Sequence, residues 1–92
     1  MRWRLSEHAR VELIRRGIPL SLLEDTIVNP QQIIPEKGAL RAYQSKIVRP
    51  DGRLLLLRIV VDDTIEPMVV VTAYQTSKVD TYWREDEDLL RS

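Results

Sequence analysis

Three long runs rich in apolar and β-branched residues constrain the fold of this 92-residue chain more than any other feature. They span Leu40–Val48, Arg53–Val61 and Met68–Gln75. Runs of this length and composition predict β-strands. The first two are joined by Arg49-Pro50-Asp51-Gly52, whose proline and glycine suit a hairpin turn, and the acidic stretch Asp62–Pro67 leads to the third. The order predicts an antiparallel meander.

Two helix signals precede these runs. Ser6 is a good N-cap for a first helix that runs to about Arg16. The capping box that Ser21 forms with Glu24 predicts a second helix, which extends through Val28 and ends at an Asn-Pro pair. The amino-terminal third of the chain is therefore expected to be helical.

Shorter elements complete the prediction. Arg2–Leu5 alternates polar and apolar residues as an edge strand does, and Gln31–Ile34 is expected to form another short strand. Ser77 and Asp80 are spaced to cap a final short helix that carries Tyr82-Trp83. The predicted fold class is α+β: two N-terminal helices pack on one face of a small, mainly antiparallel sheet, and a short helix follows. The other face of the sheet is expected to be at least partly open to water.

Size and composition exclude several classes of protein. A chain of this length forms one domain, expected to cover residues 1–92. The absence of cysteine excludes disulfides, thiolate metal sites and cysteine nucleophiles, and a single histidine argues against a structural zinc site. We therefore expect no metal and no cofactor. The longest apolar run, Leu54–Leu57, is too short to cross a membrane, and no leader segment is evident, so a cytoplasmic location is expected.

The zero net charge conceals a polarity along the chain. Residues 1–61 carry 11 Lys and Arg against 6 Asp and Glu, whereas residues 62–92 carry 3 against 8. Residues 85–92 are expected to form an acidic tail. Eleven of the 14 basic residues are arginine, whose planar guanidinium suits phosphate. A basic body favours a polyanion as partner, although arginine content that follows genomic base composition is an open alternative.

Side-chain alternation in the predicted strands separates two faces of the sheet. In the third long strand one set, Val69, Val71 and Ala73, is expected to pack on the helices, and the other, Met68, Val70, Thr72 and Tyr74, to face away. With the neighbouring strands in register, one open surface would gather Arg41, Tyr43, Arg58, Thr72 and Tyr74. Such a surface suits single-stranded RNA. A structural interpretation is also open, in which the tyrosine hydroxyls are satisfied and both arginines pair with cross-strand acids.

The ends of the chain hold two further candidate residues. His8, the only histidine, falls in the first turn of the first predicted helix and could act as a general acid or base near neutral pH. Lys78 follows the third long strand, and the amides after Ser77 could add donors for a phosphate. Metal-independent RNA cleavage uses the substrate's own 2′-hydroxyl and needs only a proton acceptor, a proton donor and cations. Both residues are equally compatible with an ordinary solvent-exposed role.

Paired motifs at the two ends of the chain resemble a known family. They are Ser6-Glu7-His8-Ala9-Arg10 and Arg16-Gly17-Ile18 at the start, and Thr72-Ala73-Tyr74, Thr76-Ser77-Lys78 and Tyr82-Trp83 at the end. Across about residues 3–84 the chain resembles a family of small bacterial proteins grouped with the RelE/ParE-like and BrnT-like toxins. That superfamily also takes in metal-independent ribonucleases of the barnase and colicin type.

The resemblance implies a RelE/barnase-like fold and a toxin-like endoribonuclease that acts on mRNA, alone or on the ribosome, with a cognate antitoxin and an oligomeric state that is open. The site that it implies comprises His8, Arg15 or Arg16, Thr72, Tyr74 and Lys78. His8 would be the acid or base, Tyr74 would stack on a base or donate a proton, and Lys78 would stabilise charge. Phosphate would be held by Arg41 and Arg58. Glu12 and Leu13 stand where the family pattern has a helix arginine.

Two alternatives accompany this hypothesis. ParE-like relatives inhibit a topoisomerase without cutting RNA, so the same fold could serve as a protein-binding module. In that case Tyr43, Tyr74 and Trp83 would be its anchors. The chain could also be a degenerate member that keeps the fold without an activity.

Overall fold

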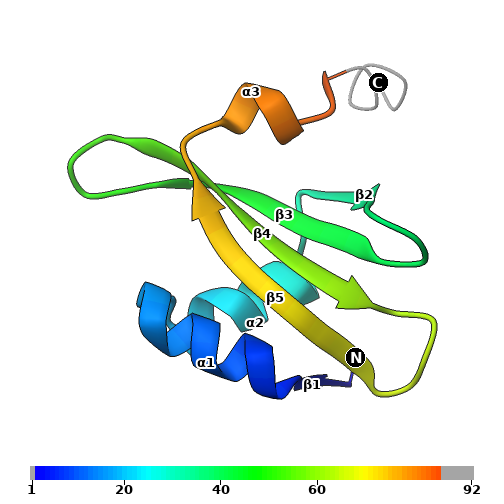
Figure 1. Ribbon diagram of the computed structural model, residues 1–92. Coiled ribbons are helices and arrows are strands. Elements are labelled where there is room, and N and C mark those ends of the chain that lie inside the picture. The colour runs from blue at the N-terminus through cyan, green and yellow to red at the C-terminus, as the bar shows by residue number, and fades with distance from the viewer. Residues whose placement is uncertain (1, 86–92) are drawn as a thin grey trace.

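The computed structural model describes residues 2–85, and it confirms the α+β class (Figure 1). Within these residues, three helices and five strands follow one another as β1 (Trp3–Leu5), α1 (Glu7–Arg16), α2 (Leu20–Val28), β2 (Gln32–Pro35), β3 (Arg41–Val48), β4 (Leu54–Asp62), β5 (Met68–Thr76) and α3 (Val79–Tyr82). Within this part of the chain, no helix is long and apolar enough to cross a membrane.

One sheet with the strand order β1-β5-β4-β3-β2 contains all five strands. The predicted meander of β3, β4 and β5 is confirmed as antiparallel, and the turn between β3 and β4 is closed by Gly52 N donating to Arg49 O at 2.9 Å. β1 is the predicted edge strand and lies parallel to the first residues of β5. Among the described residues, no strand lies beside the rest of β5 on this side.

Helix α1 lies along this part of β5, where the strand is not paired with β1. The predicted N-cap is confirmed, because the Ser6 hydroxyl accepts from Ala9 N at 3.0 Å. Ser6 also ties the helix to the strand, since its backbone N donates to Val70 O and its hydroxyl donates to Val71 O. At the other end Gly17 has φ 63°, a conformation that favours glycine, and ends the helix.

Two predicted helix starts were wrong. α2 begins at Leu20 after Pro19, which has no side-chain cap, so Ser21 lies inside the first turn and forms no capping box. The Pro19 carbonyl accepts from Leu22 N and Leu23 N, and this contact begins the helix without a side-chain cap. α3 begins after Lys78, also without a side-chain cap, because Thr76 rather than Ser77 turns back to accept from Lys78 N at 3.1 Å.

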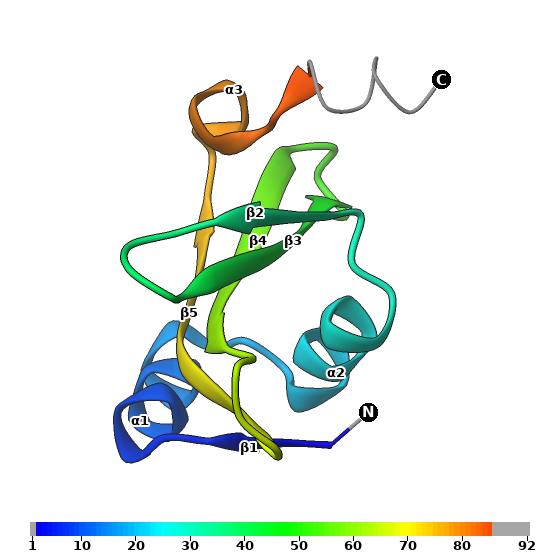
Figure 2. The same ribbon diagram turned by 90° about the vertical axis from the view of Figure 1, so that its right-hand side faces the viewer.

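The hydrophobic core lies between α1, α2 and one face of the sheet (Figure 2). Its β5 members include Met68 and Val70, which were predicted to face away. A bulge explains the error. Val61 pairs with Val70 and Val60 pairs with Thr72, so Val71 has no partner in β4 and the side chains after it change faces. Ala73 is buried in the core as predicted.

The opposite face of the sheet is partly covered by α3 and the described residues that follow it, 83–85, as both ribbon views show. Gln32 Nε2 donates to Arg84 O at 2.8 Å, Arg84 N donates to Gln32 Oε1, and Gln44 Nε2 donates to Tyr82 O. Trp83 packs beneath Lys46, whose Nζ lies 4.1 Å from a ring centroid. The segment therefore covers part of the surface expected to be open. The acidic tail predicted at residues 85–92 lies outside the described residues, apart from Glu85.

Candidate functional site

The single polar surface predicted on the sheet is divided between its two faces. Strand register pairs Arg41 with Val61 and Tyr43 with Ile59, which places both on the helix side. Arg58 instead pairs with Tyr74 and faces the α3 side, as does Thr72 opposite Val60. The prediction was wrong because Arg41 and Arg58, in adjacent strands, point to opposite faces of the sheet. Only the register between the strands reveals this.

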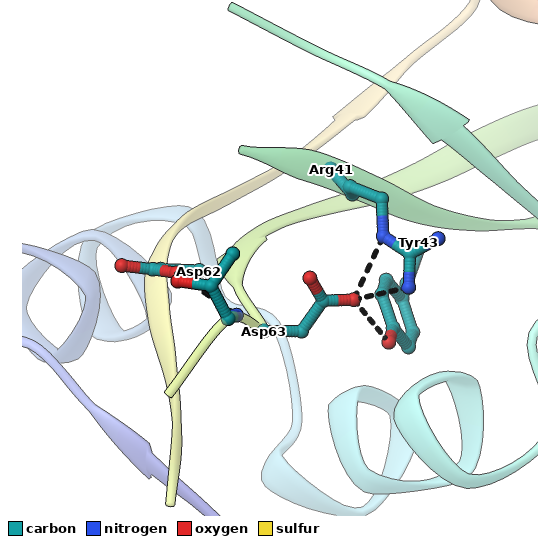
Figure 3. A network of polar contacts seen from close by, with 5 residues as sticks. Arg41, Tyr43, Asp62 and Asp63 are labelled. Atoms are coloured by element: carbon teal, nitrogen blue, oxygen red, sulfur yellow. Dashed lines mark hydrogen bonds and ion pairs between the residues drawn. The ribbon is translucent and has the colours of Figure 1, made fainter. Parts of the chain in front are cut away.

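Arg41 and Tyr43 form a closed cluster with Asp63 (Figure 3). Arg41 donates from two guanidinium nitrogens to Asp63 Oδ2, and the Tyr43 hydroxyl donates to the same oxygen at 2.8 Å. The Arg41 hydrogen bond holds the pKa of Asp63 below its usual range, whereas burial raises the pKa of the Tyr43 phenol. Tyr43 is 4% exposed. The hydrogen-bonding groups of these three side chains are satisfied by one another. This agrees with the alternative in which the tyrosine hydroxyls are satisfied and the arginines pair with acids.

Arg58 is the centre of a second network, on the α3 side of the sheet. Its guanidinium is 2% exposed and forms an ion pair with Glu36 at 2.6 Å. It also donates to Gln44 Oε1 at 3.0 Å and to the Tyr74 hydroxyl at 2.6 Å. The Tyr82 ring covers it, with the centroid 4.1 Å from Cζ. Arg58 is therefore a buried structural cation, and the phosphate-binding role predicted for it has no support in these contacts.

The structure does not bring His8 and Lys78 together. His8 is exposed near the start of α1, where Ser6 contacts Val70 and Val71 of β5. Lys78 is exposed after the far end of that strand, and extended chain from Val71 to Lys78 covers about 20 Å. Both ribbon views show the start of α1 beside the first part of β5 and the α3 segment beyond its other end. Ser77 is exposed beside Lys78 and thus shares its distance from the histidine.

Arg16, in contrast, reaches from the end of α1 to β5. Its Nη1 donates to the backbone carbonyl of Ala73 at 2.7 Å, at the edge of β5 along which α1 lies. Its Nε lies 3.0 Å from Glu12 Oε2, which also accepts from Arg15 at 2.7 Å. The Arg16 guanidinium carbon is 5.9 Å from the Tyr74 ring centroid. Two of the predicted site residues, Arg16 and Tyr74, therefore meet.

These two residues line a pocket of about 540 Å³, which we call the Arg16 pocket. Its lining comes from the end of α1, the β3–β4 hairpin and the end of β5, and comprises Arg16, Ile18, Arg49, Leu55, Tyr74 and Gln75. Within residues 2–85, the Arg49 side chain forms no ion pair or hydrogen bond. The pocket thus combines two guanidiniums with a phenol and an amide above an apolar base, a set suited to an anion with a flat or apolar substituent.

The Tyr74 phenol is protonated at neutral pH. Burial raises its pKa above the usual range, and the hydrogen bond from Arg58 only partly opposes this. Because Arg58 donates to the hydroxyl oxygen, the proton of that hydroxyl points elsewhere. Tyr74 can therefore donate a proton but cannot readily accept one as a phenolate.

Sequence reasoning missed Arg49 and Gln75 as members of this site. Arg49 was assigned only to the turn, and its role depends on where the hairpin tip packs, which no local pattern reports. Gln75 was the last residue of a predicted strand, and the bulge in β5 sets the face on which it lies. Among residues 2–85 there is no group of three or more His, Asp or Glu arranged to hold a metal ion.

Comparison with known proteins gives one match. Residues 5–75 match the family described as Domain of unknown function (DUF4258). No curated protein and no solved structure matches significantly. The resemblance to RelE/ParE-like and BrnT-like toxins and to barnase therefore stays a prediction.

Proposed function

The chain belongs to the DUF4258 family, and we propose that it is a toxin-like protein that binds single-stranded RNA in the Arg16 pocket. The observation that carries this proposal is the meeting of Arg16, Arg49 and Tyr74 in one cavity of about 540 Å³. A phosphate would lie between the two guanidiniums, and the attached sugar or base would lie over Ile18 and Leu55. This site replaces the His8–Lys78 centre expected from the sequence.

Charge supports an anionic ligand. Of the two pocket arginines, only Arg16 has a carboxylate partner among residues 2–85, and that carboxylate is shared with Arg15. Arg49 is exposed and its charge is not neutralised by any described ion pair. Bidentate guanidinium contacts with phosphate are strong and directional, so two arginines suffice to position one phosphodiester.

RNA cleavage is a second candidate function, favoured by the protonated phenol of Tyr74 beside these cations. In such a step the substrate's 2′-oxygen attacks the adjacent phosphorus and loses its proton to solvent water. The bond from phosphorus to the 5′-oxygen breaks, and that oxygen takes the Tyr74 proton. The products are a 2′,3′-cyclic phosphate and a 5′-hydroxyl, and Tyr74 regains a proton from water. Arg16 would stabilise the charge that develops on the phosphoryl oxygens.

The protein-binding alternative has less support from the predicted anchors. Tyr43 is buried beneath Asp63, and Trp83 is half-buried against Lys46 and the sheet. Only Tyr74 of the three lines a cavity, and it lies there between charged groups. Anchors of protein interfaces are usually accessible aromatic side chains in apolar surroundings.

Binding of a fluorescent single-stranded RNA, measured by anisotropy at several salt concentrations, tests the proposal. Arg16→Ala and Arg49→Ala are each expected to weaken binding about tenfold, because each removes a charged hydrogen-bond donor to phosphate. Arg53→Ala is the matched control, since Arg53 lies in the same hairpin outside the pocket lining. Equal affinity of wild type, Arg16→Ala and Arg49→Ala would contradict the proposal.

A cleavage assay with wild type and two further variants tests the second candidate function. Incubation of RNA with wild-type protein in EDTA is expected to yield 2′,3′-cyclic phosphate ends, and Tyr74→Phe is expected to lower the rate about 10²- to 10⁴-fold. His8→Ala is expected to cleave like wild type. Binding without cleavage would leave the RNA-binding function and remove the nuclease candidate.

A further inference from the structure

Arg16 is held from two directions, although it lies at a helix end where side chains are usually mobile. The carbonyl of Ala73 accepts from Nη1 at 2.7 Å, and Glu12 Oε2 lies 3.0 Å from Nε. Within residues 2–85, Arg16 donates no hydrogen bond from its remaining terminal nitrogen, Nη2. A guanidinium is planar, so fixing two of its nitrogens fixes the direction of the third.

Glu12 is an unusual residue for its place in the fold. It lies on the buried side of α1, where it is 8% exposed among Ala9 and Leu13. A carboxylate is rarely retained at such a position unless it is paired. The hydrogen bond from Arg15 holds the pKa of Glu12 below its usual range, with smaller contributions from Arg16 and His8, so this side chain is charged at neutral pH.

We propose that Glu12 is a positioning residue, which orients the Arg16 guanidinium so that Nη2 faces a phosphodiester in the Arg16 pocket. This inference rests on the proposed function, because it assigns the ligand of Arg16. Glu12 does not line the pocket and acts through Arg16 alone. Arg15, the other partner of this carboxylate, keeps Glu12 ionised and in place.

Glu12 has two opposite effects on an anion in the pocket. Its negative charge lowers the local potential for phosphate, so removal of that charge alone would strengthen binding. Its oxygen pairs with Arg16 and holds it in place, so removal of that oxygen would weaken binding. Two neutral replacements separate these effects: Glu12→Gln keeps an oxygen near Arg16, and Glu12→Met has a similar volume without an oxygen.

The test compares these two variants in the RNA-binding assay. Glu12→Met is expected to bind the RNA about two- to tenfold more weakly than Glu12→Gln, because it removes the one polar contact that Glu12 makes with Arg16. Glu7→Ala is the matched control on the same helix, since Glu7 forms the same kind of pair with the exposed Arg10. Glu7→Ala is expected to bind RNA like wild type. Equal affinities of the two Glu12 variants would overturn the inference.

A measurement without RNA separates this inference from the proposed function. In wild type the ¹⁵Nε relaxation of Arg16 is expected to report a rigid side chain, whose rigidity persists in Glu12→Gln and is lost in Glu12→Met. Loss of rigidity in Glu12→Met, in a protein whose amide spectrum is otherwise native, supports the positioning role. Rigidity that is the same in all three proteins overturns it. If wild type binds no RNA while Arg16 follows this pattern, only the assigned ligand and the proposed function fail.

Discussion

Arg58 shows how much one side chain can require of its surroundings. A guanidinium that is 2% exposed must have its donors satisfied, and four residues contact it: Glu36, Gln44, Tyr74 and Tyr82. Gln44 in turn donates to Gln32. No polar side-chain atom that is buried within residues 2–85 lacks a hydrogen-bond partner. The residue thus links the sheet to the segment that covers it.

Replacement of Arg58 by methionine is expected to destabilise the fold by about 2 kcal/mol. The change leaves Glu36 without its cation and the Gln44 and Tyr74 oxygens without a donor. Glu36 is 30% exposed, which lets water replace part of the loss and keeps the effect below that of a fully buried pair. Urea denaturation at neutral pH measures it. Arg53→Met, at an exposed position, is expected to stay within about 0.5 kcal/mol of wild type, and an equally small effect of Arg58→Met would refute the structural role.

At the scale of elements, local signals predicted most of the fold. The Ser6 cap, the Pro-Gly turn and the three long strands are where their residues predicted them, because each depends on neighbours within a few positions. The bulge in β5 and the parity of Arg41 against Arg58 depend on pairing between strands, and no local pattern encodes them. The candidate site was therefore predicted only in part. Arg16 and Tyr74 were named as site residues, but their contact with each other and the presence of Arg49 in the same pocket were not predicted.

Two serines at helix starts make a matched comparison. Ser6→Ala is expected to destabilise the protein by about 1 kcal/mol or more, because it removes the α1 cap and the contact of the hydroxyl with Val71 O. Ser21→Ala is expected to be nearly neutral, since α2 begins at Leu20 without a side-chain cap. Thermal unfolding of both variants measures the difference. A loss at Ser21 equal to that at Ser6 would restore the capping box and contradict the structure.

At the scale of the whole molecule, the cations near the carboxyl end of β5 fall into two groups. The Arg16 pocket lies where α1 and the β3–β4 hairpin meet the strand, and Lys78 lies beyond its end at the start of the covering segment. Residues that share one phosphate should be energetically coupled, whereas residues that share no partner should act independently. Coupling therefore identifies which cations belong to one site.

Double-variant cycles in the RNA-binding assay measure this coupling. Arg16→Ala and Arg49→Ala are expected to be non-additive by about 1 kcal/mol, because loss of either guanidinium releases the phosphate from the other. Arg16→Ala and Lys78→Ala are expected to add within about 0.5 kcal/mol, since no described contact joins them. Strong coupling between Arg16 and Lys78, with none between Arg16 and Arg49, would move the binding site from the β3–β4 hairpin to the α3 segment and exclude the pocket as its centre.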